Sequence, residues 1–400
     1  MKKNCSIAFV PIALIRKYLR VMRQKIYAKK YQIIKYPKQE MTVYKHICDS
    51  EWYDSFSPEL YNLCKEKKVV AKFPEIDIYC LENASVREGS DLVVFEEKVW
   101  WDKYDEYEFV TLAQPADVNL VRFDKNYATI VPARKTEHIN GNVFSLVGVF
   151  SHMWSHFLFQ FVTKLFCAGE SGLLDNNITV LTNDYNDENI EYILKMYLSQ
   201  YPNVKRKIVK PGIDYVCEHL YCMRSTSSSY NDAIVYWDYR LIKPQFMIDR
   251  IFKYIVDPLT NKIKDNPKKH SKIFLSRHSN RILTNTDEVE LYFKKEGFYF
   301  VEGADLSLEE KVDLFYHAEI VVGPHSSAWQ NIIFCNNVKC LEFCNNRYSN
   351  EFVFYTMAKK NVIKWLKVSG QDENSDRRSD YTISLTKIKE AYNYLLESHN

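Results

Sequence analysis

The chain has 400 residues, 46% of them hydrophobic and 26% charged, a balance that is typical of globular proteins and excludes a disordered chain. This length exceeds one ordinary domain and predicts two of typical size. The net charge of +3 conceals an asymmetry. Residues 1–45 contain twelve Lys or Arg and one acid, whereas the remaining chain has 42 basic and 50 acidic residues. A basic arm on a mildly acidic body indicates an anionic partner.

The basic arm, residues 1–45, combines a short apolar run with an amphipathic stripe. The run "IAFVPIALI" has only nine residues, too few to span a bilayer, and no small-residue cleavage site follows it. The spacing Ile12, Ile15, Leu19, Met22 and Ile26 predicts a helix with one apolar face between basic flanks. Such a helix can lie in an anionic membrane surface, or it can pack on the body with its basic face in solvent.

The first half of the body predicts an N-terminal α/β domain over residues 46–235. "NVFSLVGVF" and "ITVLTN" have the apolar content of buried strands, and "HFLFQFVTKLFCAG" and "NIEYILKMYLSQYP" that of helices. Ten cysteines include no C-x-x-C pair, and Cys335, Cys340 and Cys344 cluster in or beside a strand. Reduced, cytosolic thiols are a simpler interpretation than a zinc site.

The second half alternates strands and helices more regularly. The helix "SLEEKVDLFYHA" opens with a capping box, Ser307 with Glu310, and Asn285 is the expected cap of "TDEVELYFKKEGF". This alternation predicts βαβ units around a parallel sheet, hence a Rossmann-like domain over residues 236–368. Residues 369–400 add a charged loop and a C-terminal amphipathic helix. The strands expected are "KIFLSR", "FYFVEG", "EIVVG", "KCLEF" and "VIKWL", and the further helices "SAWQNIIF" and "NEFVFYTMAKKN".

The stretch "EIVVGPHSSAWQNIIF" ends a buried strand on Gly-Pro and places His325, Ser326 and Ser327 before a helix. Ligands bind beyond the carboxyl ends of strands in open α/β sheets, and a helix N-terminus offers unpaired N–H groups to an anion. The stretch therefore predicts either an anion site or a plain turn in which a serine caps the helix. Arg277 and Arg281 follow another strand of the same sheet and can reach the same ligand, or can solvate a surface loop.

Several segments together resemble glycosyltransferase family 61: "SRHSNRILTN", "VEGADLSLEEKVDLFYHAEIVVGPHSSAWQNIIF", "CLEF" and, earlier, "MWSHFLFQFVTKL". The resemblance covers about half the chain and hardly touches residues 1–140. It implies a GT-B-like fold, in which two Rossmann-like domains face a cleft. It also implies an inverting, metal-independent transfer from a nucleotide sugar, commonly a UDP-sugar, with no cofactor. The sequence has no clean Asp-x-Asp pair that would hold a divalent cation.

The resemblance also implies roles for individual residues. Arg277, Arg281 and the His325–Ser327 loop would hold the donor diphosphate, because arginine forks and main-chain N–H groups suit that charge. Asn331 would pin this loop or contact the donor. Glu342 would accept bonds from ribose hydroxyls, or form a buried ion pair. His156 matches the first-domain histidine of the family and would take the proton of the acceptor hydroxyl, unless it is a hydrogen-bonded core histidine.

Departures from the family pattern leave alternatives open. The usual Gly and Ala after the loop histidine are Ser326 and Ser327, and a usual Asn and a frequent acid in the earlier motif are Met153 and Gln160. Trp154 and Phe157 can stack on a sugar or fill core, and core filling is expected.

We expect a cytoplasmic glycosyltransferase, hexosyl or pentosyl, on the inner membrane face. It would act on an oligosaccharide or lipid-linked glycan acceptor for a surface polysaccharide and bind no nucleic acid. The alternatives are a polysaccharide pyruvyl transferase and an inactive relative that binds glycan or acts as a scaffold.

Overall fold

A computed structural model describes much of the chain, and the two lobes of the fold lie within the described part. The predicted helix between Ile12 and Ile26 lies outside it. The described residues are 27–34, 37–73, 75–101, 117, 119–124, 126–224, 228–229, 241–242, 245–267, 270–278, 281–302, 306–346, 353–372 and 379–397.

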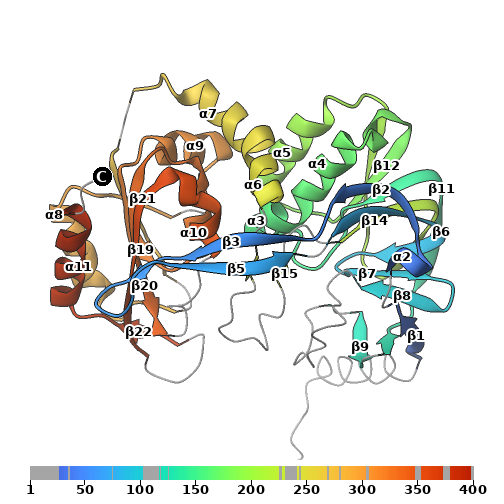
Figure 1. The fold of residues 1–400 in the computed structure, drawn as a ribbon, viewed down its shortest axis with the longest axis horizontal. Helices are drawn as coiled ribbons and strands as arrows, with labels where there is room; N and C mark the ends of the chain where they lie inside the picture. Colours follow the sequence, from blue (N-terminus) through green and yellow to red (C-terminus); the bar gives the residue numbers. More distant parts are fainter. Residues whose placement is uncertain are drawn as a thin grey trace, which may run out of the picture.

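The first lobe is built on a mixed sheet of eleven strands (Figure 1). Its parallel part has the order β13-β12-β11-β14, with α4 and α5 in the connections. The expected strands and helices of this region are present, but the strand expected over residues 142–150 ends at Ser145 and the first helix begins with a π-helical turn. From β14 the sheet continues through β6, β7 and β8, antiparallel at each step. The strands are β1 (Lys29–Ile33), β2 (Thr42–Cys48), β6 (Ile76–Arg87), β7 (Leu92–Phe95), β8 (Lys98–Trp101), β9 (Leu120–Phe123), β10 (Tyr127–Ile130), β11 (Lys135–Ser145), β12 (Ile178–Thr182), β13 (Val204–Ile208) and β14 (Ile213–Met223).

The second lobe holds the predicted parallel sheet, so the α/β class is confirmed. Its strand order is β18-β17-β19-β20-β21, with β22 antiparallel at the edge. The chain leaves β17 to one side for β18 and returns to the other side for β19, which makes a topological switch point between β17 and β19. The strands are β17 (Lys272–Leu275), β18 (Tyr299–Val301), β19 (Ile320–Pro324), β20 (Val338–Asn345), β21 (Val362–Asp372) and β22 (Tyr381–Thr382).

The helices follow the predicted periodicity, with local differences. The capping box of Ser307 and Glu310 is confirmed. Asn285 stands at the N-cap of α8, but its amide donates to Glu288 and to the carbonyl of Ile383, so it does not cap the helix. The expected helix "SAWQNIIF" is the 3-10 helix η5. The helices are α2 (Pro37–Glu40), α3 (Trp154–His156), η2 (Phe157–Phe161), α4 (Val162–Glu170), η3 (Leu173–Asp175), α5 (Glu188–Leu198), α6 (Gln245–Ile251), η4 (Phe252–Val256), α7 (Asp257–Ile263), α8 (Thr286–Lys295), α9 (Leu308–Tyr316), η5 (Ser327–Phe334), α10 (Val353–Ala358), η7 (Lys359–Asn361) and α11 (Leu385–Glu397).

The two lobes share one apolar core. A single cluster of buried residues includes Phe157 and Ile193 from the first lobe and Trp329 and Tyr355 from the second. The segment α6–η4–α7 crosses between the lobes, because α6 packs on α4 and α7 packs on α9 (Figure 1). Burial of this shared surface favours one relative position of the lobes.

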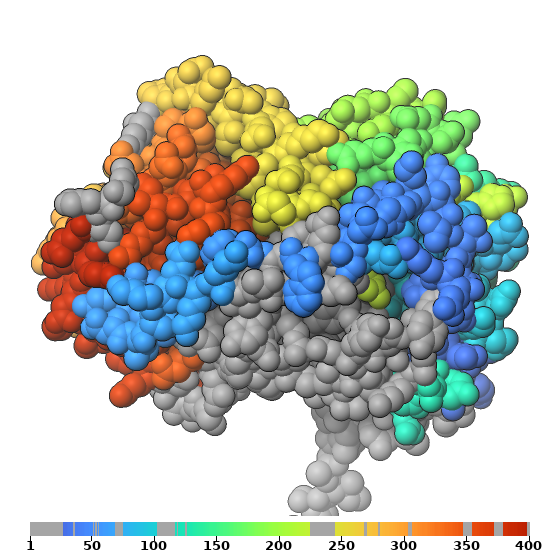
Figure 2. Space-filling model, viewed as in Figure 1, coloured from blue at the N-terminus to red at the C-terminus, as the bar shows by residue number. Residues whose placement is uncertain are grey.

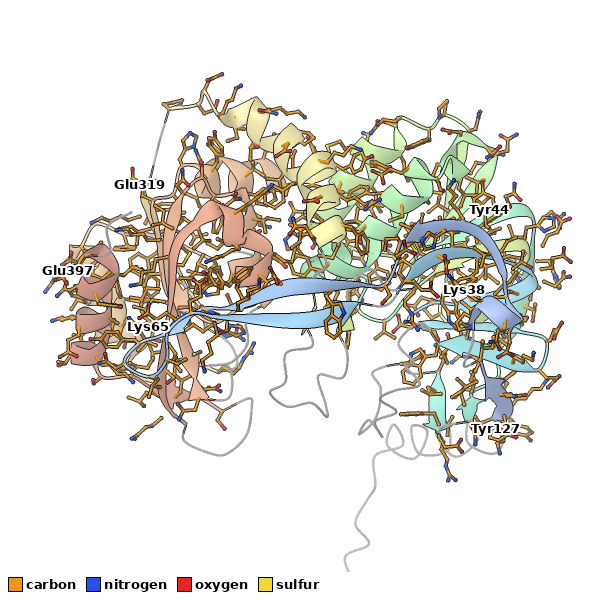
Figure 3. The ribbon with its side chains drawn as sticks, viewed as in Figure 1. Lys38, Tyr44, Lys65, Tyr127, Glu319 and Glu397 are labelled. Atoms are coloured by element: carbon orange, nitrogen blue, oxygen red, sulfur yellow. The ribbon has the colours of Figure 1, made fainter. Side chains whose placement is uncertain are left out.

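A long β-hairpin ties the N-terminal part of the chain to the second lobe. Strands β3 (Glu51–Ser57) and β5 (Lys67–Phe73) run across the face of the molecule, and the short β4 (Glu59–Leu60) between them pairs with β21. Figure 2 shows this segment on the surface of the second lobe, and Lys65 lies there in Figure 3. The sequence assigned this hairpin to the N-terminal domain, and only strand pairing shows where it docks.

The predicted arm also contains sheet. Strand β1 and the start of β2 fall within residues 1–45, and both belong to the first sheet. β1 has the apolar Ile33 buried at its end, which explains its place in the lobe. Among the described residues, no helix is both long and apolar enough to cross a membrane.

Gly323 permits the close approach of β19 to β17. A Cβ at this position would lie 2.4 Å from the carbonyl oxygen of Leu275, and its φ is +154°. An alanine here would have to push the two central strands apart. The glycine of the Gly-Pro break noted in the sequence is therefore needed where the two strands flank the switch point.

Candidate active site

The site lies at the switch point of the second sheet. Ser276 and Arg277 follow β17, and His325, Ser326 and Ser327 follow β19, its parallel neighbour. Since the carboxyl ends of parallel strands meet at one edge, these residues converge. The fold thus brings together the two segments that the sequence singled out.

The loop after β19 is held by main-chain contacts. Arg277 donates from Nη1 to the carbonyl oxygen of His325 at 3.1 Å, and the amide of His325 donates to the carbonyl oxygen of Phe343 at 2.6 Å. Trp329 donates from Nε1 to the carbonyl oxygen of Pro324 at 3.0 Å. Arg277 therefore fixes the loop in addition to carrying charge beside it.

Glu342 is the centre of a buried charge cluster beneath the loop. Its side chain is 1% exposed, contacts Nδ1 of His325 through Oε1, and accepts a bond from Nε1 of Trp365 at 2.8 Å. The ammonium of Lys367, also buried, lies 3.5 Å from Oε1. Burial alone would raise the pKa of Glu342, but Lys367 and His325 hold it below its usual value.

This cluster bears on the two roles predicted for Glu342. The surroundings of Glu342 are those of a buried ion pair, the second alternative, and the carboxylate does not line the cavity described next. The imidazole of His325 is turned toward Glu342 and likewise does not line the cavity. Both residues therefore support the loop after β19 through the buried cluster and do not line the cavity.

A cavity of about 740 Å³ lies between the two lobes. Ser276 and Arg277 line it from the end of β17, and Ser326, Ser327 and Asn331 line it from the loop and η5. A volume of this size suits a small-molecule ligand. The remaining residues that line it are Trp154, Asn186, Asp187, Glu188 and Asn189 from the first lobe, and His278, Glu302, Leu306, Ser307, Glu310, Lys311, Ala328 and Gln330 from the second.

Four buried polar atoms of residues that line this cavity have no hydrogen-bond partner among the described residues. They are Oγ of Ser326, Oε1 of Gln330, Oδ1 of Asn331 and Nε1 of Trp154. Buried polar groups are almost always hydrogen-bonded, so these atoms are suited to a ligand that both donates and accepts. Sugar and ribose hydroxyls have that property.

The two arginines that were predicted to bind the diphosphate lie in different places. Arg277 lines the cavity, whereas Arg281, also described and half-buried, does not. Arg281 has a left-handed backbone, with φ of +56°, in the turn before α8. The two residues therefore face different surroundings although four positions separate them.

His156 lies on α3 in the first lobe. Its side chain is half-buried, with Nδ1 3.2 Å from Oε1 of Gln160 and its ring 5.1 Å from that of Phe150. It does not line the cavity, but Trp154 on the same short helix does. Trp154 is half-buried and packs against the shared apolar core as expected, but it also lines the cavity, while Phe157 is fully buried as expected.

Two groups that line the cavity were not predicted from the sequence. Lys311 lies on α9 at a position that the helical periodicity assigns to the buried face, and the N-terminal turn of α5, capped by Asp187, contributes from the other lobe. Asp187 could have been recognised as the N-cap of α5 from the sequence. The residues around it do not, however, show that this helix end faces the cavity.

The comparisons with known proteins agree with this geometry. The family model described as Glycosyltransferase 61 matches residues 154–341. These residues begin at Trp154 on the first lobe, include the loop after β19, and end in β20. A search of curated proteins found no match. The residues that line the cavity all lie within the matched segment, and residues 154–341 form a glycosyltransferase family 61 domain.

Proposed function

We propose that the protein is an inverting, metal-independent glycosyltransferase, hexosyl or pentosyl, with a GT-B-like arrangement of its lobes. It moves a sugar from a nucleotide sugar, UDP-linked in our proposal, to the acceptor of a surface polysaccharide or glycoconjugate. One observation carries the proposal: the cavity between the lobes combines Arg277 with buried, unpartnered polar atoms on both sides. A cation together with hydroxyl-binding groups matches a sugar joined to a diphosphate.

The donor side of the proposal lies on the second lobe. The guanidinium of Arg277 pairs with the diphosphate, and the first N–H groups of η5 donate to the same oxygens. Oδ1 of Asn331, which is buried without a hydrogen-bond partner among the described residues, accepts a hydrogen bond from a ligand hydroxyl. With guanidinium and main-chain donors placed in advance, the charge that develops on the departing diphosphate is stabilised.

The acceptor side of the proposal lies on the first lobe. The acceptor oxygen attacks C1 of the sugar as the C1–O bond to the diphosphate breaks, and its proton passes to the imidazole of His156. The placement of Trp154 on the cavity, two residues before His156, supports this assignment. Attack from the face opposite the leaving group inverts the configuration at C1.

Replacement of His156 by alanine is expected to lower kcat about 10²- to 10⁴-fold, because proton transfer by a positioned base contributes that much. The measurement is turnover at saturating donor and acceptor, with its pH profile. His152→Ala is the matched control, since His152 is exposed four residues earlier. Unchanged turnover in His156→Ala would remove this histidine from the mechanism.

The decisive experiment incubates the purified protein with a panel of nucleotide sugars and follows binding and slow hydrolysis. We expect one donor to bind and hydrolyse, equally well with and without EDTA, and to yield product of inverted anomeric configuration by NMR. Phosphoenolpyruvate turnover without any nucleotide-sugar hydrolysis would indicate a pyruvyl transferase. Binding of oligosaccharide with no nucleotide affinity would indicate the scaffold alternative.

We further propose that residues 1–45 dock the protein on the cytoplasmic face of an anionic membrane, where lipid-linked acceptors occur. The support is the net charge of this segment, twelve basic residues against one acidic residue. Deletion of residues 1–26 should release the protein from anionic vesicles in a sedimentation assay, and persistent binding would refute the idea.

A further inference from the structure

The buried face of α9 contains a lysine. The buried residues of this helix are Leu308, Lys311, Val312 and Phe315, spaced i, i+3, i+4 and i+7. This spacing is the apolar stripe of an amphipathic helix, so its second position would ordinarily hold an apolar side chain. Lysine is among the residues least often buried, because its charge loses solvation. The amphipathic pattern therefore does not explain Lys311.

The cavity supplies a reason. The side chain of Lys311 is only 5% exposed, yet it lines the 740 Å³ cavity together with Arg277 and Ser326. Lys311 lies on α9, which packs against η5, whereas Arg277 follows strand β17. The two cations thus reach one cavity from two walls. A charge shielded from bulk water attracts an anion more strongly than a charge at the surface.

We infer that Lys311 is a second diphosphate-binding residue of the donor site, acting from α9 beside Arg277. The inference rests on the proposed function, and it extends that function to a residue outside the β17 and β19 loops. The diphosphate of a nucleotide sugar carries two negative charges, and two cations placed around it neutralise both without a bound cation. A ligand without phosphate would gain nothing from Lys311.

Two variants of Lys311 separate binding from folding. Lys311→Gln removes the charge and keeps most of the length. Lys311→Met removes the charge and places an apolar side chain in the buried stripe, and a melting curve of each variant checks that it is folded before binding is compared. Lys295→Gln is the matched control, because Lys295 is an exposed lysine of α8 in the same lobe and does not line the cavity.

The experiment is calorimetric titration with uridine, UMP and UDP, and with guanosine, GMP and GDP as a second series. We expect both Lys311 variants to weaken binding of the preferred nucleoside diphosphate about 10- to 100-fold, and to leave its nucleoside within about twofold, since bonds to charged groups have that strength. Lys295→Gln should match the wild type. The ligand at which the loss first appears identifies the phosphate that Lys311 contacts.

The other outcomes are distinguishable. If the wild type binds a nucleoside diphosphate and both variants bind it equally well, the role of Lys311 is overturned and the proposed function stands. An equal loss for nucleoside and diphosphate would show a structural role and overturn the inference as well. If the wild type binds neither series, the proposed function and the inference fall together.

Discussion

Arg277→Ala is expected to lower kcat/KM for the nucleotide sugar about 10²- to 10³-fold, the range seen when one donor to a developing anionic charge is removed. The residue has two roles that the substitution removes together. It lines the cavity, and its Nη1 donates to the carbonyl of His325, which shapes the loop after β19. The measurement is steady-state hydrolysis and transfer with the donor identified in the nucleotide-sugar panel.

Arg281→Ala is the natural control for this prediction. Both arginines belong to the same short motif, but Arg281 does not line the cavity. We therefore expect a loss of less than about tenfold, because a charge that does not contact the donor contributes at most about 1 kcal/mol to its binding. Equal losses in the two variants would show that the sequence motif, and not the cavity geometry, describes the donor site correctly. No loss in Arg277→Ala would refute the proposed diphosphate site.

Glu342→Gln is expected to destabilise the protein by about 3–5 kcal/mol, the usual cost of removing one partner from a buried ion pair. Glutamine can still accept from Nε1 of Trp365, but it leaves the buried ammonium of Lys367 without its carboxylate. Chemical denaturation at pH 7 measures the change. Glu97→Gln is the control, since the Lys29–Glu97 pair is exposed and should contribute less than about 1 kcal/mol.

The same substitution predicts a pH dependence. Lys367 and His325 offset the burial of Glu342 and hold its pKa in the folded protein below the usual 4.5. The carboxylate therefore contributes stability above about pH 4.5, and this contribution is lost as pH falls through the lower pKa of the folded state. The stability difference between wild type and Glu342→Gln should shrink on acidification through this window. A difference that stays constant would mean that the charge of Glu342 is not what stabilises the cluster.

A double variant tests the cluster as a unit. Adding Lys367→Gln to Glu342→Gln removes the uncompensated ammonium, so the double variant should be less destabilised than the two single changes added together. Strict additivity would mean that the two side chains do not interact.

The sequence predicted well whatever depends on local periodicity. The capping box at Ser307, the apolar strands on either side of Gly323 and the amphipathic helix α11 were all expected from spacing alone. Strand alternation even implied that Arg277 and Ser326 would converge, because parallel strands share one carboxyl edge.

Prediction was poorer where the direction of a side chain matters. The sequence assigned both Arg277 and Arg281 to the diphosphate and favoured Arg277, and only Arg277 lines the cavity. Trp154 was expected in the core, and it packs against the core but also lines the cavity. The hairpin β3–β5 was assigned to the first domain, although β4 adds to the second sheet.

By itself, the sequence determined the α/β class, the order of the strands and helices along the second lobe, and the family that residues 154–341 match, because periodicity, capping and motif spacing are local properties. The tertiary structure alone decided which side chains face one cavity, that His325 turns to Glu342 beneath the loop, and that Lys311 reaches the site from a helix. These features depend on how elements distant in the sequence pack together. The local sequence of a helix or strand does not specify which other element will pack against each of its faces.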